Sequence, residues 1–350
     1  MGGSIFCFLH VLVQSGYKSY VLYCVFTIYL PDMSASFQID STNEKAKRRI
    51  LITGSNGLLG QKLVELLIQD PSITTLATAV GKNRLSFTDG YEYHELNITD
   101  QFEVDEVISR LKPHVVIHTA AMTNVDQCEM EKETCWKLNV TAVEYLIKAC
   151  KKNNVFLEHL STDFIFDGTA GPYKEDDEPN PVSFYGWSKY AAEKLVINSD
   201  INWAIARTVL VYGIAHDMSR TNIILWVKKS LEEGKQIKVV TDQFRTPTLA
   251  EDLAEGCFLI AKMEEKGIFN ISGKDFLTPY EMAVQTADYF GLDKSFISQT
   301  DASAFTQPAR RPPRTGFDLT KSRNTLGYEP HTFREGIALL AHQSGFLKQI

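Results

Sequence analysis

Residues 50–67 read ILITGSNGLLGQKLVELL: a short apolar run, a glycine-rich turn and then leucines at helical spacing. The run 50–53 favours a buried strand because it is short, rich in β-branched residues and stopped by Gly54. From Leu58 to Leu67 the leucines recur as they do on one face of a helix. The stretch therefore predicts a strand, a glycine turn and a helix in direct succession.

The same alternation continues along the chain. Apolar runs at 75–80, 115–118 and 155–157 are separated by segments of helical pattern. Such alternation is typical of a parallel sheet with helices on both faces. We therefore predict an α/β fold, a Rossmann-type doubly wound parallel sheet with a smaller C-terminal substrate lobe. Capped helix starts are predicted where a capping side chain stands three residues before a glutamate, at Asp100, Thr278 and Thr332.

The composition is that of an ordinary globular protein. Hydrophobic residues make up 44% and charged residues 23% of 350 positions, which excludes collagen-like and wholly disordered chains. Acidic residues outnumber basic ones, 43 against 36, and give a formal charge of -7. This is the wrong sign for a protein that coats phosphate backbones, so no nucleic-acid partner is expected.

The six cysteines are scattered, and none forms a Cys-x-x-Cys pair. They predict reduced, mostly buried thiols rather than a disulfide framework. Cys128 and Cys135, two helical turns apart, are expected to be core thiols rather than zinc ligands. The eight histidines are equally dispersed, so we predict no metal site. We also expect a cytoplasmic protein.

The N-terminal segment differs from the rest of the chain. Its apolar runs, 5–13 and 20–30, are each too short to span a membrane, and no signal-peptide pattern accompanies them. We expect residues 1–48 to be an extension that is disordered or is spurious upstream sequence, without a membrane role. Residues 49–217 are predicted to form mainly the NAD(P)-binding Rossmann domain, and 218–350 mainly a sugar-nucleotide-binding lobe, with some elements interleaved.

The glycine turn carries the first chemical signal. A dinucleotide pyrophosphate needs backbone N–H groups at a helix N-terminus, and a side chain at the turn would hold the phosphates away. The spacing here is Gly-x-x-Gly-x-x-Gly, placed between a predicted strand and a predicted helix. It predicts a dinucleotide site at Gly54, Asn56, Gly57, Leu58, Leu59 and Gly60.

The end of the second predicted strand bears on the cofactor. An acid there accepts the ribose hydroxyls of NAD and repels the extra phosphate of NADP. The sequence 80–84 contains no acid, while Lys82 and Arg84 can pair with a phosphate. NADPH is therefore the expected cofactor, and NADH stays open.

A tyrosine and a lysine carry the second signal. Tyr185 and Lys189 are four residues apart at the start of a predicted helix, so they share one helix face. A nearby ammonium favours the phenolate and is expected to lower the pKa of Tyr185, which makes it a usable general acid. Thr162 and Asp163 follow the strand that begins near Val155, at the edge where ligands of open α/β sheets bind.

Together these residues resemble the extended short-chain dehydrogenase/reductases, and within that superfamily the dTDP-4-dehydrorhamnose reductase family. The resemblance runs from about residue 49 to the end of the chain. Its ordered segments are 52–60, 120–126, 161–168, 172–177, 179–181, 185–189, 242–248 and 311–312.

The resemblance implies reduction of the 4-keto group of a nucleotide-linked 6-deoxysugar, with dTDP-4-dehydrorhamnose giving dTDP-L-rhamnose. By the same comparison Tyr185 gives the proton, Lys189 holds the nicotinamide ribose, Thr162 bonds the carbonyl and Asp163 positions the sugar. Further cofactor contacts are implied for Asn97, Ile98, Ala120, Ala121 and Met122. Substrate contacts are implied for Thr123, Asp126, Thr162, Asp163, Gln243, Arg245 and Arg311.

The sequence departs from the family in places. Asn97 stands where relatives often have an acid against the adenine, and Arg245 where they commonly have a small residue. Asn139 resembles the proton-relay asparagine of many short-chain reductases, and a helix residue without that role is the other interpretation.

Two other functions stay open. A non-catalytic NADP-binding regulatory subunit, like that of methionine adenosyltransferase, resembles much of the same region. A sugar-nucleotide epimerase would use the same tyrosine and lysine but return the hydride to the substrate. A homodimer is also left open.

Overall fold

The computed structural model describes residues 11–15, 18–22, 47–217 and 221–345. The chain divides into two compact units, residues 1–46 and residues 47–350. In the first unit, β1 (Val11–Ser15) pairs with β2 (Lys18–Leu22) as an antiparallel hairpin. The remainder of the predicted extension lies outside the described residues up to Lys47.

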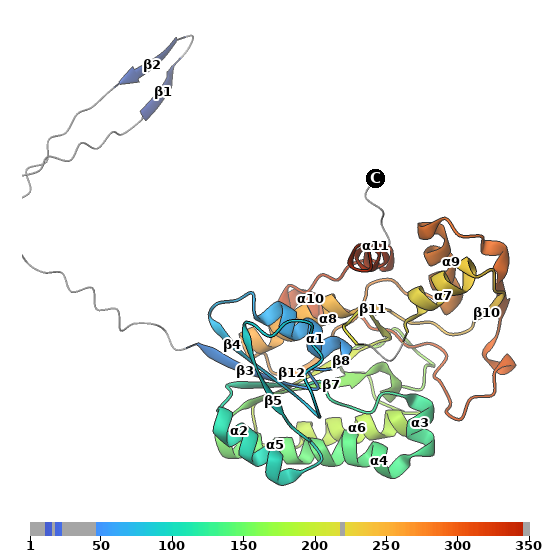
Figure 1. Ribbon diagram of the computed structural model, residues 1–350, viewed down its shortest axis with the longest axis horizontal. Coiled ribbons are helices and arrows are strands. Elements are labelled where there is room, and N and C mark those ends of the chain that lie inside the picture. The colour runs from blue at the N-terminus through green and yellow to red at the C-terminus, as the bar shows by residue number, and fades with distance from the viewer. Residues whose placement is uncertain (1–10, 16–17, 23–46, 218–220, 346–350) are drawn as a thin grey trace, which may run out of the picture. The chain divides into compact units, whose positions relative to one another are not determined.

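The second unit is built on a seven-stranded sheet in the order β12-β8-β7-β6-β3-β4-β5, and every pair in it is parallel (Figure 1). This confirms the predicted doubly wound Rossmann-type sheet. The order reverses between β3 and β6, where open α/β sheets form their ligand crevice. The strands are β3 (Arg48–Thr53), β4 (Ile73–Ala79), β5 (Tyr91–Glu95), β6 (Val115–His118), β7 (Phe156–Thr162), β8 (Trp203–Thr208) and β12 (Gly267–Asn270).

Helices cover both faces of this sheet, because residues of its central strands alternate between two apolar cores. Ile50 and Ile52 of β3 pack with the helices on one face, whereas Leu51 packs on the other. In Figure 1 the first face carries α1 (Leu58–Leu67), α8 (Ala250–Met263) and α10 (Thr320–Leu326). The opposite face carries α2 (Gln101–Leu111), α5 (Ala142–Asn153) and α6 (Phe184–Ile197).

Short helical segments connect β6 to α5 and follow β7. They are α3 (Val125–Met130), α4 (Lys132–Trp136), a π-helical turn (Lys137–Thr141) and a 3₁₀ turn (Asp163–Ile165).

The C-terminal part forms a smaller group of elements beside the sheet (Figure 1). β10 pairs in parallel with β13, and the two-residue strands β9 and β11 pair in parallel with each other. β12, which lies in the segment predicted to be mainly lobe, instead extends the Rossmann sheet next to β8. The elements are β9 (Val211–Tyr212), α7 (Ile223–Glu232), β10 (Ile237–Val240), β11 (Thr248–Leu249), α9 (Pro279–Phe290), β13 (Ile297–Thr300), α11 (Phe333–Gln343) and two 3₁₀ turns (Lys294–Phe296, Ala302–Ala304).

Two of the three predicted capping boxes form completely. The side chains of Thr278 and Thr332 each accept a hydrogen bond from the backbone N–H three residues on. The glutamate at that position accepts in turn from the backbone N–H of the threonine. At Asp100 the carboxylate accepts the backbone N–H of Glu103, but the Glu103 carboxylate accepts from the N–H of Asn97 instead. Only one of the two hydrogen bonds of the third capping box therefore forms, because the Glu103 carboxylate accepts from Asn97 rather than from Asp100.

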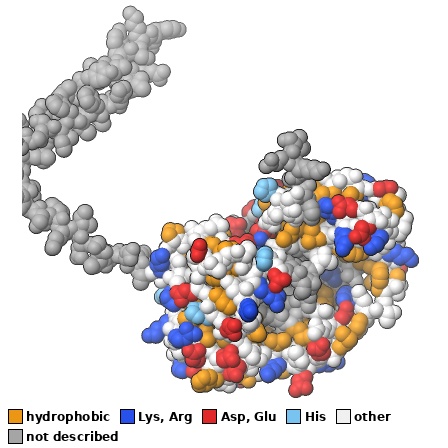
Figure 2. Space-filling model, in the orientation of Figure 1, with side chains coloured by type: hydrophobic (Ala, Val, Ile, Leu, Met, Phe, Trp, Pro, Cys, Tyr) orange, Lys and Arg blue, Asp and Glu red, His pale blue; other side chains and the backbone are white. Residues whose placement is uncertain are grey.

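Within the described ranges, none of the helices combines the length and the apolar character needed to cross a bilayer. Acidic and basic side chains are interspersed over the face seen in Figure 2. This mixed surface agrees with the charge balance of the sequence.

Candidate active site

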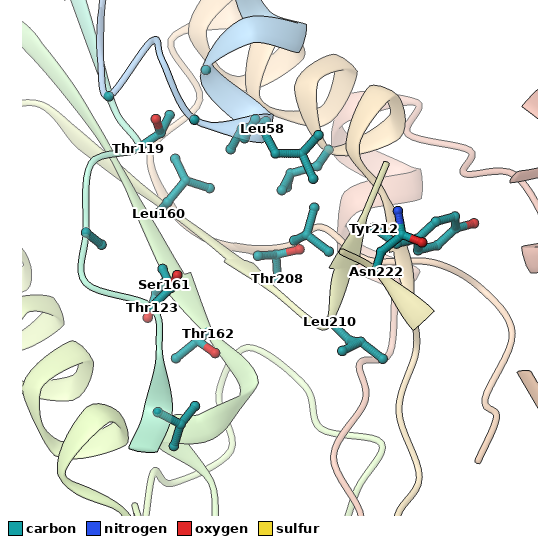
Figure 3. A pocket seen from close by; sticks show the side chains of 18 of the residues that line it. Leu58, Thr119, Thr123, Leu160, Ser161, Thr162, Thr208, Leu210, Tyr212 and Asn222 are labelled. Atoms are coloured by element: carbon teal, nitrogen blue, oxygen red, sulfur yellow. The ribbon is translucent and has the colours of Figure 1, made fainter. Parts of the chain in front are cut away.

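A cavity of about 730 Å³ lies at the carboxyl ends of the central strands, between the Rossmann sheet and the C-terminal elements (Figure 3). This volume is suited to a dinucleotide or a substrate of similar size. Leu58 from the start of α1, and Leu160 and Thr208 from the sheet, face the space. The predicted site residues that line it are Gly54, Asn56, Gly57, Leu58, Leu59, Gly60, Arg84, Ala121, Thr123, Thr162, Asp163, Tyr185, Lys189 and Arg311.

Glycine is present at the three positions of the turn for different physical reasons. Gly54 has a φ of 72°, and a Cβ there would lie 2.8 Å from the backbone of Ala120. A Cβ at Gly60 would lie 2.3 Å from the Gly54 carbonyl oxygen, so this glycine lets α1 pack against the turn. At Gly57 the nearest atom is 3.3 Å away, and the residue lines the cavity. The space beside Gly57 is therefore the space a ligand can use.

The N-terminus of α1 opens into the same cavity. Gly57 is its N-cap and supplies no side-chain hydrogen bond to the first turn. The early N–H groups of a helix lack intrahelical partners and carry partial positive charge. Leu58, Leu59 and Gly60 place this end of the helix on the cavity wall. The turn thus fits the pyrophosphate of a dinucleotide on both steric and electrostatic grounds.

Asn56 joins the glycine turn to the loop after β4. Its Nδ2 donates to the carbonyl of Lys82 at 2.9 Å, and its Oδ1 accepts the N–H of Arg84 at 2.9 Å. Arg84 lines the cavity, and its Nε lies 3.8 Å from a carboxylate oxygen of Asp217. The Lys82 side chain is exposed and does not line the cavity. Of the two predicted cations, the structure brings Arg84 to the site.

Asn97 and Ile98 are not among the residues that line the cavity. The Asn97 Oδ1 accepts the backbone N–H of Thr99 at 3.1 Å and its hydroxyl at 2.8 Å, which forms a local turn. Ile98 is buried in the core on the α2 side of the sheet. The adenine contacts implied for these residues stay predictions.

The loop after β6 is held by Asn139. Ala121 lines the cavity, Ala120 packs against Gly54, and Met122 is buried next to them. Asn139 accepts the Met122 N–H at 2.8 Å and donates to its carbonyl at 3.0 Å. Asn139 lies in the π-helical turn, a feature often found at functional sites. Its side chain therefore positions the loop that follows β6.

Tyr185 lies on the cavity wall, from the first turn of α6. Burial raises the pKa of its phenol, the carboxylate of Asp163 acts in the same direction, and a hydrogen bond with Thr162 opposes them. The expectation that Lys189 lowers this pKa is wrong for the protein alone, because the loss of hydration dominates. A raised pKa keeps the phenol protonated at neutral pH, which is the form that donates a proton.

Lys189 follows one turn later on the same helix and also lines the cavity. Its side chain is buried, and Nζ lies 3.3 Å from Nε2 of His159. Burial lowers the pKa of Lys189 to about 8, although the Glu193 carboxylate favours the charged form. At neutral pH the lysine is therefore mainly an ammonium, and it titrates at a lower pH than an exposed lysine.

Thr162 ends β7 and shares the cavity wall with Asp163. The Thr162 hydroxyl donates to Oδ1 of Asp163 at 3.1 Å, and the Thr315 hydroxyl donates to Oδ2. Burial raises the pKa of Asp163, while the guanidinium of Arg245, with Nε 3.8 Å from Oδ2, lowers it. Asp163 is therefore held by residues that lie far along the chain.

The cations of the C-terminal part have internal partners. Arg245 is buried and lies outside the cavity lining, and its two terminal nitrogens donate to the carbonyls of Phe244 and Pro312, each at 2.7 Å. Arg311 makes a two-pronged contact with the carboxylate of Asp126, at 3.1 and 2.7 Å. Arg245 and Asp126 therefore have internal partners in the protein alone, and the substrate contacts implied for them stay predictions.

A second cavity of about 440 Å³ adjoins the first. Arg311 lines both cavities, and Gln243 lines the second one. The exposed rings of Trp226 and Phe305 lie on the wall of the second cavity. Arg311 is therefore the predicted residue that stands between the two spaces.

Several lining residues were not predicted. Ser161, Thr208 and Tyr212 lie at or just beyond the carboxyl ends of β7, β8 and β9, the position at which sheet residues face a crevice. That rule could have identified Thr208, had β8 been recognised. Among residues 47–217 and 221–345 no group of three or more His, Cys, Asp or Glu side chains is arranged to hold a metal ion.

Comparison with known proteins identifies relatives over almost the whole described chain. A family model, the RmlD substrate binding domain, matches residues 48–345. Methionine adenosyltransferase 2 subunit beta of Mus musculus is 32% identical over 297 residues, covering 83% of this chain and 86% of that protein.

Two reductases are similar over the same length. The dTDP-4-dehydrorhamnose reductase of Aggregatibacter actinomycetemcomitans is 30% identical over 302 residues, covering 83% of this chain and 97% of that protein. The crystal structure of dTDP-4-dehydrorhamnose reductase from Bacillus anthracis in complex with NADP superposes with a TM-score of 0.72 at 26% identity. That match covers 85% of this chain and 99% of the other.

Proposed function

The chain belongs to the RmlD substrate binding domain family, within the extended short-chain dehydrogenase/reductases, and from this we propose that it is an NADPH-dependent reductase of a nucleotide-linked 4-keto-6-deoxysugar. The substrate that the resemblance implies is dTDP-4-dehydrorhamnose, which would give dTDP-L-rhamnose. The observation that carries the proposal is that Tyr185, Lys189 and Thr162 share one cavity with the glycine turn. A phenol beside a dinucleotide cradle is the arrangement that ketone reduction needs.

The cofactor would be held by the glycine turn and the start of α1, with Lys189 toward its nicotinamide ribose. When bound there, the nicotinamide supplies the hydride. Gly57 leaves room for the pyrophosphate, and the open N–H groups at Leu58 and Leu59 bind its charge. Arg84, at the rim of this space, supplies a cation for the 2′-phosphate of NADPH. NADPH is therefore proposed over NADH.

Tyr185 donates the proton to the oxygen of the ketone as negative charge develops on it. The buried phenol is protonated at neutral pH, so it enters the reaction in the form a general acid requires. The Thr162 hydroxyl, which donates to Oδ1 of Asp163 in the protein alone, would turn from that carboxylate to donate to the same oxygen. Removing one such donor typically costs about 2.7 to 4 kcal/mol of transition-state stabilisation.

Lys189 stabilises the phenolate that remains after proton transfer. Its ammonium lies one helical turn from Tyr185, in a site where burial removes the screening effect of water. Asp163 is held by Thr162, Thr315 and Arg245, and its fixed carboxylate can accept a hydrogen bond from a sugar hydroxyl. The residues given these roles, Thr162, Asp163, Tyr185 and Lys189, all line the same cavity.

The second candidate is a non-catalytic NADP-binding subunit of a methionine adenosyltransferase. The observation that favours it is the 32% identity to the beta subunit of the mouse protein over 297 residues. Such a subunit would bind NADPH without consuming it. A sugar-nucleotide epimerase, the third reading of the sequence, would also show no net consumption of NADPH.

The test is an NADPH-oxidation assay with the purified chain and dTDP-4-dehydrorhamnose supplied by upstream enzymes. We expect loss of absorbance at the NADPH band that requires the ketosugar, and formation of dTDP-L-rhamnose. Tight NADPH binding without turnover of this or related ketosugars would favour the subunit reading. The cytoplasmic location and a homodimer remain part of the proposal, and sedimentation would measure the second.

A further inference from the structure

His159 contacts Lys189 from within the sheet, and the proposed mechanism gives it no role. His159 lies on β7 and Lys189 on α6, and both side chains are buried, at 0% and 3% exposure. Nε2 of the imidazole lies 3.3 Å from Nζ of the lysine. The contact joins the helix that carries Tyr185 to the central sheet.

The imidazole of His159 is neutral. Burial, followed by the nearby Lys189 and His118, holds its pKa well below the ordinary value. A neutral imidazole has one N–H and one acceptor nitrogen. When Lys189 is an ammonium, it donates to Nε2, and the ring proton is then on Nδ1. Nδ1 of His159 is buried without a hydrogen-bond partner among the described residues, so the lysine is the polar contact that remains for this ring.

A row of side chains on neighbouring strands fixes the His159 ring. His118 is its register partner on β6, and the two rings stack with centroids 5.4 Å apart and planes inclined by 27°. Nδ1 of His118 lies 2.7 Å from the hydroxyl of Thr53, the register partner on β3. The His159 ring is thus fixed by its stacking on His118, whereas the longer side chain of Lys189 is free to adjust its position to the ring.

We propose that His159 is a positioning residue for Lys189, which holds Nζ at the cavity wall in both protonation states of the lysine. An ammonium donates to Nε2. A neutral amine accepts from Nε2–H once the imidazole exchanges tautomer, so the contact persists as the lysine titrates. The catalytic importance of Lys189 rests on the proposed function, whereas the contact itself does not.

The other groups around Lys189 act through charge. Glu193, on the same helix, favours the ammonium. Further titratable groups near this pocket are Tyr185 of α6, Asp163 after β7, His118 of β6, Cys128 of α3 and Cys135 of α4. His159 differs from these groups because it contacts Nζ at hydrogen-bond distance.

The experiment measures the titration of Lys189 in the protein without cofactor. Lysine labelled with ¹³C and ¹⁵N gives Nζ resonances by NMR, and a K189M variant assigns the one from Lys189. In H159M, whose thioether is only a weak acceptor, both forms of Lys189 lose the contact, but the ammonium loses the stronger, charge-assisted hydrogen bond. We therefore expect the acid dissociation constant of Lys189 to rise by a factor of about three to ten. In H159Q, whose amide can both accept and donate, it should return toward the wild-type value.

The control is H114Q, because His114 accepts the N–H of Arg49 outside the cavity. It should leave the Lys189 titration unchanged. Circular dichroism verifies folding, and H159N, whose shorter amide falls short of Nζ, replaces H159M if that variant does not fold. An unchanged Lys189 titration in the folded variant overturns the proposal. A shifted titration in a protein that reduces no ketosugar supports the contact and contradicts only the proposed function.

Discussion

Nε of Arg245 lies 3.8 Å from Oδ2 of Asp163, and both side chains are almost fully buried. The two residues are 82 positions apart in the sequence (245 − 163). Arg245 also donates to the carbonyls of Phe244 and Pro312, so it connects the loop after β10 and the loop before α10 to the end of β7. The end of β7 that lines the cavity is thus tied to the C-terminal part by Arg245 as well as by Thr315.

Replacing this arginine should destabilise the fold. In R245M the Asp163 carboxylate stays buried without its cation, and breaking a buried pair typically costs about 3–5 kcal/mol. Because burial already raises the pKa of Asp163, losing Arg245 raises it further. A raised folded pKa gives stability at low pH that is lost as pH rises, so the deficit should be larger at pH 8 than at pH 4. Urea unfolding at both pH values measures it.

Two variants sharpen that measurement. D163N in the R245M background removes the stranded charge and should recover part of the lost stability at pH 8. R314M is the matched control, since Arg314 is exposed and stacks on Phe244 and Phe276 outside the buried pair. Equal losses for R245M and R314M would show that the ion pair has no special role.

Removing the phenol hydroxyl should abolish most turnover and leave binding intact. In Y185F the general acid is lost, which typically lowers the rate about 10²- to 10⁴-fold. The Kd for NADPH should change little, because the ring still fills its place against Phe164. Y190F, on the same helix, is the control. Steady-state kinetics and fluorescence titration give the two numbers, and near-normal turnover of Y185F would remove Tyr185 from the mechanism.

The glycines of the turn should separate binding from folding. Gly57 lines the cavity, and a Cβ there meets only the Gly54 carbonyl oxygen, at 3.3 Å, so G57V should keep the fold with a small local shift and lose NADPH binding. An alanine at Gly60 meets the Gly54 carbonyl at 2.3 Å, so G60A should lower the melting temperature instead. Thermal unfolding with and without NADPH distinguishes them. Stabilisation of folded G57V by NADPH would show that the turn is only structural.

Glu158 offers a test of the core that is independent of function. Its side chain is fully buried on β7, and burial raises the pKa of the carboxyl well above its ordinary value. The unfolded chain ionises near its ordinary pKa of 4.5, so this group contributes stability below that pH and loses it as pH rises toward the folded pKa. E158Q should therefore be more stable than wild type at pH 8. Its free energy of unfolding should also vary less with pH. A variant less stable at pH 8 would contradict the burial argument.

The strands and turns with local signals were predictable, and the edges of the sheet were not. β3, β6 and the start of β7 overlap short apolar runs, at 50–52, 115–117 and 155–157, and the sequence shows them as such, whereas the rest of β7 is buried but largely polar. β5 reads YEYHE and is half exposed, so it carries no apolar run. β12 has four residues and joins the sheet through its pairing with β8, a contact that comes from a distant part of the chain.

The same limit applies to the site. Gly57, Tyr185 and Lys189 are recognisable because their meaning depends on neighbours within one turn of structure. The roles of Arg245 and His159 depend on contacts across 82 and 30 positions, which no local pattern encodes. Burial also reversed the expected direction of the Tyr185 pKa, because desolvation depends on packing that the sequence does not display.

The central claim is net hydride transfer to the ketosugar, and isotopic labelling measures it directly. The purified chain is incubated with NADPH that carries deuterium at both C4 positions of the dihydronicotinamide and with dTDP-4-dehydrorhamnose, and the sugar is analysed by mass spectrometry and NMR. We predict one deuterium at C4 of the sugar for each NADPH oxidised, and none with Y185F at the same reaction time. Recovery of unlabelled ketosugar with bound, unoxidised NADPH would contradict the reductase account.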